Sequence, residues 1–374
     1  MKALFLSHEH SLAAGGGGQQ QCTREYHDTL SAAGFHLQDE AFSTDRSWPA
    51  RLRRRFLPAP YANLIPRDYV ARLERCVRQV EPDFVFCNLY NFISMGRHLR
   101  SVLPTRTRLV LLSHGLASVD EVHAARIARG AAKNRGRDSS SDTRVGAMLR
   151  MESAGLPAFD HTFCLAEFEV EICRWLGARS ASWLPRTVNA AAPLRWRPIG
   201  SRVGCVGTFD HPPNLEGLTL FCRALAGLKP QGVRLRLVTR SHEVAARLAA
   251  AFEFVDPLGP LESGVALEAE VATWNAFVHP IFCYAMGCST KVATAMEWGL
   301  PILTTQAGLR GYSWNAGELP IVATAEELAQ LALAAMETQY AEGLREAVVR
   351  VAAASPTTES VALQIRRDLR VEVT

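Results

Sequence analysis

The stretch His279–Pro301, HPIFCYAMGCSTKVATAMEWGLP, decides the fold of this chain. An apolar strand ends at His279-Pro280, a loop around Gly287 opens a helix, and Gly299-Leu300-Pro301 ends the helix before another strand. A strand, a helix and a second strand in this order are typical of a parallel sheet covered by helices. We therefore expect an α/β protein with its ligand site at the carboxyl ends of the strands.

The same stretch predicts an anion site. Lys291 lies in the first turn of the helix, where free N–H groups and one ammonium group favour a diphosphate. We expect Lys291 and the backbone of Gly287, Cys288, Ser289 and Thr290 to form this cradle. A solvated lysine at a helix end is the plainer alternative.

Outward from this stretch, the alternation of strands and helices extends along the whole chain. In the first half, strands are expected at Lys2–Leu6, Phe35–Phe42, Asp83–Cys87, Arg108–Ser113, Asp160–Leu165 and Ala181–Leu184. In the second half, they are expected at Arg202–Val206, Arg234–Val238, Ala276–Pro280, Pro301–Thr304 and Pro320–Val322. The polar stretch Ala131–Thr143 breaks the pattern and is expected to be a mobile loop.

The length of 374 residues favours two domains. Pro193, Pro198 and Gly200 mark a linker. We expect an N-terminal domain over residues 1–189, a linker over 190–201 and a second domain over 202–358. A C-terminal helix over 359–374 can pack back on the first domain. Two doubly wound domains facing a cleft are the simplest architecture for this pattern.

The composition narrows the class of protein. With 48% hydrophobic and 21% charged residues, the chain is neither disordered nor fibrous. No apolar run has the length of a membrane span, and the start of the chain indicates a buried strand rather than a signal peptide, so a cytoplasmic location is expected. The nine cysteines form no CxxC pair and indicate reduced, mostly buried thiols.

The formal charge of +4 is unevenly distributed, with +6 in residues 1–190 and −2 in the remainder. This is too weak a bias to indicate nucleic acid, but it suits an anionic substrate or a membrane surface. Arg51–Phe56 mixes basic and apolar residues, so a contact with anionic lipid at the inner face of the membrane is one hypothesis. A solvated charged face is the other.

The first domain offers three candidate sites. Gly16, Gly17 and Gly18 precede a helix, where they allow close approach of an acceptor, although a plain flexible turn gives the same pattern. His8 lies in a polar His-Glu-His segment, which we expect at the rim of the cleft on the acceptor side rather than at a metal. His114 ends a buried strand, where it can contact a sugar hydroxyl or stabilise developing charge; a merely hydrogen-bonded histidine is equally consistent.

The second domain and the hinge offer three further candidates. Gly207 follows the first strand of the second domain and permits close approach of a ligand. Gly308 lies in a glycine-containing turn after a later strand, on the same edge. Arg186 lies at the hinge, within reach of a phosphate.

Together these stretches resemble the family 4 glycosyltransferases, which have the GT-B fold. The most specific likeness is Gly287…Lys291…Gly299-Leu300-Pro301, which is similar to the donor signature of that family. The segment Gly207–Gly217 is similar to the opening of its donor domain, and Leu184–Asn189 to its interdomain approach. The resemblance implies two Rossmann-like domains and transfer, with retention, of a sugar from a nucleoside diphosphate sugar to a glycan or lipid-linked acceptor.

The resemblance also implies roles for particular residues. Lys291 would contact the diphosphate, His114 would be the cleft histidine near the sugar, and Gly308 would lie close to the donor. Thr294, Glu297 and His279 would lie on the ribose or base side. No metal, other cofactor or nucleic acid is implied.

Two departures from the family pattern bear on activity. Thr294 stands where the family usually has the glutamate that holds the ribose, and Met286 stands at the preceding glutamate of the pair. Glu297, one helical turn after Thr294, is a possible substitute. A non-catalytic relative or partner subunit is therefore an alternative to a transferase, and a sugar-nucleotide epimerase is a more distant one.

Overall fold

A computed structural model describes residues 1–13, 17–56, 65–131, 139–189, 193–261, 264–314 and 318–371. The chain divides into two compact units. The first unit contains Met1–Pro185, Met286–Cys288 and Thr357–Thr374, and the second contains Arg186–Ala285 and Ser289–Pro356. The C-terminal helix thus belongs to the first unit, and so does a tripeptide from the Gly287 loop.

The first unit is built on a parallel sheet of six strands in the order β2-β1-β3-β4-β5-β6. The strands are β1 (Lys2–His8), β2 (His36–Phe42), β3 (Phe84–Asn88), β4 (Arg108–Ser113), β5 (His161–Cys164) and β6 (Ala181–Trp183). The order reverses between β1 and β3, which is where a doubly wound sheet opens a crevice at its carboxyl edge.

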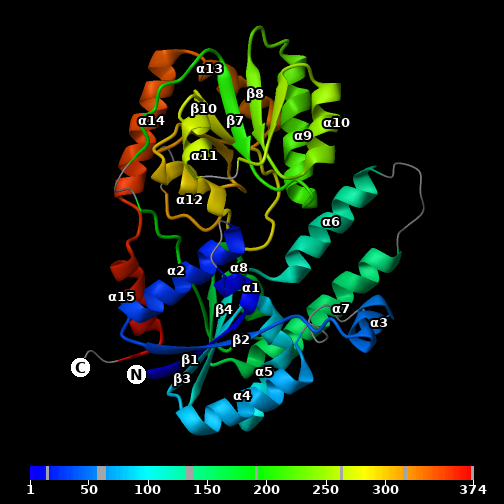
Figure 1. The fold of residues 1–374 in the computed structure, drawn as a ribbon, viewed down its shortest axis with the longest axis vertical. Coiled ribbons are helices and arrows are strands. Elements are labelled where there is room, and N and C mark those ends of the chain that lie inside the picture. The colour runs from blue at the N-terminus through cyan, green and yellow to red at the C-terminus, as the bar shows by residue number, and fades with distance from the viewer. Residues whose placement is uncertain are drawn as a thin grey trace. The chain divides into compact units, whose positions relative to one another are not determined.

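Both faces of the first sheet are covered. In β1, Leu4 and Leu6 enter one apolar cluster, whereas Ala3 and Phe5 enter another, as the two-residue period of a strand requires. The helices are α1 (Glu9–Leu12), α2 (Gly18–Ala32), α3 (Trp48–Phe56), α4 (Arg67–Val80), α5 (Gly96–Val102), α6 (Ala117–Ala131), α7 (Ser139–Gly155), α8 (Glu167–Trp175) and α15 (Thr358–Asp368), with short 3-10 turns at Tyr90–Met95 and Leu156–Ala158. Helices α2 and α15 lie side by side (Figure 1) and share the second cluster.

The second unit repeats the design with the strand order β12-β11-β10-β7-β8-β9. Its strands are β7 (Arg202–Val206), β8 (Arg234–Val238), β9 (Val255–Gly259), β10 (Ala276–His279), β11 (Ile302–Thr305) and β12 (Ile321–Val322). Its helices are α9 (Pro212–Gly227), α10 (His242–Ala251), α11 (Gly264–Val271), α12 (Thr290–Glu297), α13 (Ala325–Ala334) and α14 (Thr338–Ala353). Here the order reverses between β7 and β10.

All eleven expected strands are present, with bounds that shift by two residues at most. The expected loop over Ala131–Thr143 is wrong at both ends. Ala131 ends α6 and Ser139–Thr143 begin α7, while residues 132–138 lie outside the described residues. Serines and an aspartate, which suggested a loop, are also the residues that favour the first turn of a helix.

Strand β9 was missed because Pro257 interrupts it. Proline is tolerated in a strand only at an edge or an irregularity. Strand β9 is the edge strand of its sheet, and its pairing with β8 shifts register between Leu237 and Val238. The position of β9 at the edge of the sheet therefore permits a strand that contains a proline.

The cysteine prediction is confirmed. The cysteines are free thiols, and all except the half-buried Cys288 are buried. No described helix combines the length and the apolar character that crossing a membrane requires. Helix α3 carries the proposed lipid-contact segment Arg51–Phe56, and Trp48 and Leu52 on this helix are exposed. Membrane contact stays a prediction.

Candidate functional site

The reversal in each sheet brings together the candidate residues of that unit. In the first unit, Ser7 and His8 end β1, and Asn88 ends the neighbouring β3. In the second unit, Gly207 follows β7, and His279 ends the neighbouring β10.

His114 follows the last residue of β4 and is 8% exposed. Its Nε2 lies 2.7 Å from Asn88 Oδ1, and its ring packs against Tyr26 of α2 with centroids 5.5 Å apart. The Tyr26 hydroxyl donates to the Ser113 carbonyl at 3.2 Å. Two neighbouring elements thus hold the imidazole in one orientation at the carboxyl edge of the sheet.

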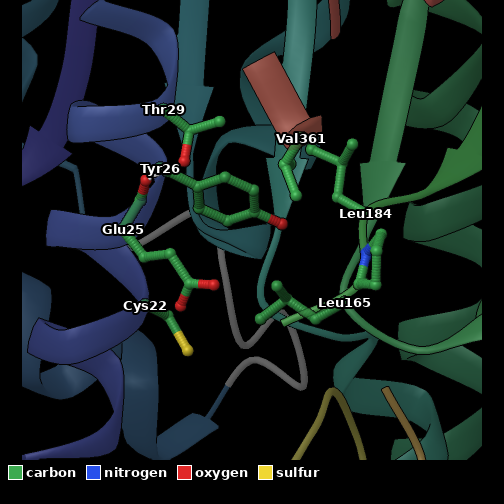
Figure 2. A pocket seen from close by; sticks show the side chains of 8 residues that line it. Cys22, Glu25, Tyr26, Thr29, Leu165, Leu184 and Val361 are labelled. Atoms are coloured by element: carbon green, nitrogen blue, oxygen red, sulfur yellow. Dashed lines mark hydrogen bonds between the residues drawn. The ribbon is translucent and has the colours of Figure 1, made fainter. Parts of the chain in front are cut away.

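Tyr26 also borders a small apolar pocket beside α2. Figure 2 shows its ring extending from the helix toward Leu184. The pocket has a volume of about 10 Å³, which is the size of a single water. It is too small for a sugar and is not part of the candidate site.

His8 is occupied by local contacts. Its Nδ1 accepts from the N–H of His10 at 3.1 Å, and its Nε2 lies 2.8 Å from Thr44 Oγ1. Burial lowers its pKa. The described residues contain no group of three histidine, cysteine or carboxylate side chains placed to hold a metal ion.

The glycine run forms the start of α2. Gly17 is the N-cap and donates its N–H to Gln20 Oε1 at 2.9 Å, and Gly18 is the first helical residue. Gly16 lies outside the described residues. An acceptor role for Gly16, Gly17, Gly18 and His8 stays a prediction.

The tripeptide Met286–Cys288 contacts carboxylates within the first unit. The N–H of Met286 donates to Asp120 Oδ1 at 2.7 Å, and the N–H of Gly287 donates to Glu169 Oε1 at 3.0 Å. Gly287 has φ of 61°, and a β-carbon there would collide with the His114 carbonyl oxygen. The N–H of Gly287, expected to face a diphosphate, is thus occupied by Glu169 in this structure. The Cys288 side chain packs against the apolar cluster that α2 and α15 share.

Lys291 is the centre of a basic group in the second unit. It is the second residue of α12, and its half-buried side chain passes over the Phe209 ring with Nζ 5.9 Å from the centroid. A β-carbon on Gly207 would lie 2.8 Å from both Cε and Nζ of Lys291, so only glycine lets the end of the lysine pack here. Burial lowers the pKa of Lys291, with a further lowering from the nearby Arg310 guanidinium and an opposing effect of Cys205.

His279 and Arg310 complete the basic group. His279 is 2% exposed, and burial together with Lys291 and Arg310 lowers its pKa well below the usual range. Neither Nε2 of His279 nor Nε of Arg310 has a hydrogen-bond partner among the described residues. Gly308 lies against this group, because a β-carbon there would be 3.1 Å from His279 Cδ2.

No carboxylate in the described part of the chain pairs with Lys291, His279 or Arg310. Lys291 and Arg310 are two half-buried positive charges close to each other, and such a pair favours an anion that neutralises both. The start of α12 lies beside Lys291 and adds N–H donors. The arrangement therefore has the chemistry of an anion site.

The first turn of α12 is held in place by Tyr312. Its hydroxyl donates to the Ser289 carbonyl and accepts from the N–H of Ala293 at 2.9 Å. Ser289 is the N-cap, and Thr290 is the first helical residue. The buried Arg186 donates its backbone N–H to Gly311 at 3.1 Å, next to Arg310 in sequence.

Two of the three residues predicted on the ribose or base side, Thr294 and Glu297, make other contacts. Thr294 Oγ1 donates to the Thr290 carbonyl at 3.2 Å, within its own helix. Glu297 Oε1 accepts from the backbone N–H of Asn189 at 3.3 Å. One Glu297 oxygen therefore holds the segment that enters the second unit.

Comparisons with known proteins agree with this architecture. Residues 200–338 match the family described as glycosyl transferases group 1. Sucrose-phosphate synthase from Thermosynechococcus elongatus is similar over 99% of this chain and 98% of its own, with a TM-score of 0.68 and 18% identity. HepE from Anabaena, solved with UDP-glucose, is similar over 100% of both chains, with a TM-score of 0.65 and 14% identity.

The chain has the GT-B fold. The expected resemblance to family 4-like glycosyltransferases of this fold is thereby confirmed, and the second unit carries the glycosyltransferase family segment. At these identities, the likeness to solved structures shows the fold alone. A comparison with curated protein sequences gives no significant match.

Some residues of the site were missed in the sequence. Arg310 and Tyr312 lie in a stretch that was singled out only for Gly308. Asn88 was included in no candidate, although a polar residue that ends the buried strand FVFCN is a recognisable signal.

Proposed function

We propose that this GT-B chain transfers a sugar from a nucleoside diphosphate sugar to a glycan or lipid-linked acceptor, with retention at the anomeric carbon. The observation that carries the proposal is the basic group of Lys291, His279 and Arg310, which lacks a described carboxylate partner. A donor diphosphate would supply the missing counter-charge. The group 1 glycosyltransferase match over residues 200–338 supports the same assignment.

The leaving diphosphate would be stabilised by the protein rather than by a metal. Lys291 and Arg310 would neutralise its charge, and the N–H groups at the start of α12 would donate to its oxygens. Preorganised donors of this kind stabilise charge that develops as the leaving group departs. Lys291 is suited to this role because burial leaves its ammonium group incompletely solvated.

Uridine diphosphate is the first nucleotide to test. The structural neighbour HepE has been solved with UDP and with UDP-glucose. In this chain, the end of Lys291 packs against Gly207, which would place Nζ for a contact with the diphosphate. The identity of the sugar and of the acceptor would depend on contacts other than these.

Titration calorimetry with UDP, GDP, ADP, CDP and dTDP tests the donor site. One nucleotide should bind the wild type, and Lys291→Gln should weaken that binding by about 10- to 150-fold, the loss of one charge-assisted hydrogen bond. Lys229→Gln is the matched control, since Lys229 is an exposed lysine in the same unit. If no nucleotide binds, or if both variants bind as the wild type does, the donor assignment is wrong.

Turnover is tested separately from binding. The donor that binds is incubated with glycan and glycolipid acceptors after exhaustive dialysis against EDTA, and the product is examined by proton NMR for its anomeric configuration. The expected result is an acceptor-dependent product that retains the configuration of the donor. An inverted product, or a strict requirement for added divalent metal, would contradict the proposed mechanism.

A non-catalytic donor-binding subunit is the second candidate. The observation in its favour is that Thr294 bonds within its own helix, while Glu297 holds the Asn189 backbone. Both side chains are thus engaged by the protein itself. Nucleotide binding without release of sugar from any donor, together with a stable complex with another transferase, would favour this candidate.

A further inference from the structure

A buried polar network connects His114 to three elements of the first unit. Asn88 Nδ2 donates to Ser7 Oγ and to Thr23 Oγ1, each at 2.9 Å, and Asn88 Oδ1 lies 2.7 Å from His114 Nε2. Asn88 and Ser7 are fully buried, and Thr23 is 1% exposed. The amide therefore contacts the end of β1, the second turn of α2 and the residue after β4.

The direction of these bonds can be worked out from Thr23. Its hydroxyl donates its single hydrogen to the Gln19 carbonyl at 2.9 Å. Toward Asn88, Thr23 Oγ1 can therefore only accept, which requires the Asn88 nitrogen on that side. The Asn88 oxygen must then face His114, and His114 Nε2 must carry a proton.

We infer that Asn88 is a positioning residue that fixes His114 in the Nε2–H tautomer, so that Nδ1 acts as an acceptor toward a substrate hydroxyl. The assignment of the tautomer depends only on the hydrogen-bond network. The proposed contact with a substrate hydroxyl rests on the proposed transferase function. A neutral imidazole has one donor and one acceptor nitrogen. Because Asn88 occupies the donor, His114 can accept a hydrogen bond from a sugar hydroxyl but cannot donate one while it is neutral.

The backbone next to Asn88 supports a fixed orientation. Leu89 has φ of 103° and ψ of 148°, a region that residues other than glycine rarely adopt. Its N–H donates to the Leu112 carbonyl at 3.1 Å, and its side chain is buried. The chain is thereby turned sharply after Asn88, and the amide stays inside the network rather than following the strand outward.

Imidazole ¹⁵N NMR of the full chain tests the tautomer without any substrate. His114 is assigned by the signals that disappear in His114→Gln. The wild type should show a protonated Nε2 and a lone pair on Nδ1 at neutral pH. A protonated Nδ1 with an unprotonated Nε2 would overturn the inference.

Two variants test the role of Asn88 and its partner. Thr23→Val removes the hydroxyl that orients the amide with little change in volume, so a mixture of His114 tautomers should appear. Thr29→Val is the control, because Thr29 is also a buried α2 threonine whose hydroxyl donates to the carbonyl four residues earlier. A single Nε2–H tautomer in both variants would mean that the network does not set the proton position.

Asn88→Asp places a carboxylate against the imidazole, where it should keep His114 protonated to higher pH. Two titratable groups near His114 are Tyr26, whose ring packs on it, and Glu169, whose Oε1 accepts from the nearby Leu116 N–H. The Asn88→Asp substitution leaves both of these side chains in place. Circular dichroism and thermal melting would verify that the variant is folded. A His114 titration midpoint equal to that of the wild type would contradict a direct contact between the side chain of residue 88 and the imidazole.

The effect of Asn88 on catalysis is measured by the pH dependence of kcat/KM. If neutral His114 accepts from substrate, the acidic limb of the kcat/KM profile should move to higher pH in Asn88→Asp, while UDP binding is unchanged. Failure of transferase activity in the wild type would remove the proposed function, but the NMR result would still decide the tautomer. An acidic limb that does not move, in an active and folded Asn88→Asp variant, would overturn the positioning role.

Discussion

The substitution Gly207→Ala isolates the contact on which the donor site depends. The added β-carbon would lie 2.8 Å from both Cε and Nζ of Lys291 and 3.4 Å from Phe209 Cζ. Carbon atoms in contact prefer about 3.5–4 Å, so the end of the lysine must move by roughly 1 Å. The fold should tolerate this, because the end of a flexible side chain moves rather than the backbone.

The expected magnitudes separate binding from stability. Loss of the aligned ammonium should weaken nucleotide binding by about 1.5–3 kcal/mol, or about 10- to 150-fold. The free energy of unfolding should change by less than about 1 kcal/mol, since a small packing cost is offset by the reduced freedom of the unfolded chain.

Titration calorimetry with UDP on Gly207→Ala, Lys291→Gln and the double variant is the assay. Gly227→Ala is the control, because a β-carbon at Gly227 meets nothing within 4 Å. If Gly207 acts through Lys291, the double variant should bind no more weakly than Lys291→Gln alone. Full additivity, or wild-type affinity in a folded Gly207→Ala protein, would refute the reasoning.

Further predictions concern stability. Burial lowers the pKa of His161 to about 4, so its native state resists protonation and stability should fall as the pH drops from about 6.5 to about 4. Urea melts at the two pH values measure the free energy of unfolding. In His161→Gln, the difference between the two values should be smaller than in the wild type by up to about 3 kcal/mol, and an equal difference would contradict the prediction. Gly204→Ala should destabilise the second unit by about 1–3 kcal/mol or more, because a β-carbon there would collide with the buried Trp274 ring. Thermal melting measures this, and an unshifted Tm would mean that the ring is not packed as described.

The fold was predictable because its signals are local. Buried parallel strands appear as short apolar runs, and Arg108–Ser113 and Arg234–Val238 were located from the sequence at their observed bounds. Helix α6, in contrast, was not expected from the sequence. Its first turn is held by buried carboxylates from other elements, with Glu152 accepting from the N–H of Ser118 and Glu169 from that of Leu116. Because these carboxylates lie far from α6 in the sequence, the residues around the helix start do not reveal them.

The anion site illustrates the limit of sequence reasoning more sharply. Lys291 could be found, because a lysine at a helix start after a glycine loop is a local pattern. That His279 and Arg310 share its surroundings follows only from the order of β10 and β11 and the turn after them. The proposed anion site also depends on the lack of a carboxylate partner among the described residues, and this lack is a property of the folded chain.

The same reasoning explains why Asn88 was missed while His114 was found. A histidine after a buried strand is noticed because of its chemistry, whereas an asparagine that ends a strand gives a weaker signal. Its importance comes from three bonds to residues 81, 65 and 26 positions away in sequence. The proposed proton position on His114 therefore depends on Gln19 and Thr23 through a fully buried amide, and only the three-dimensional structure connects them.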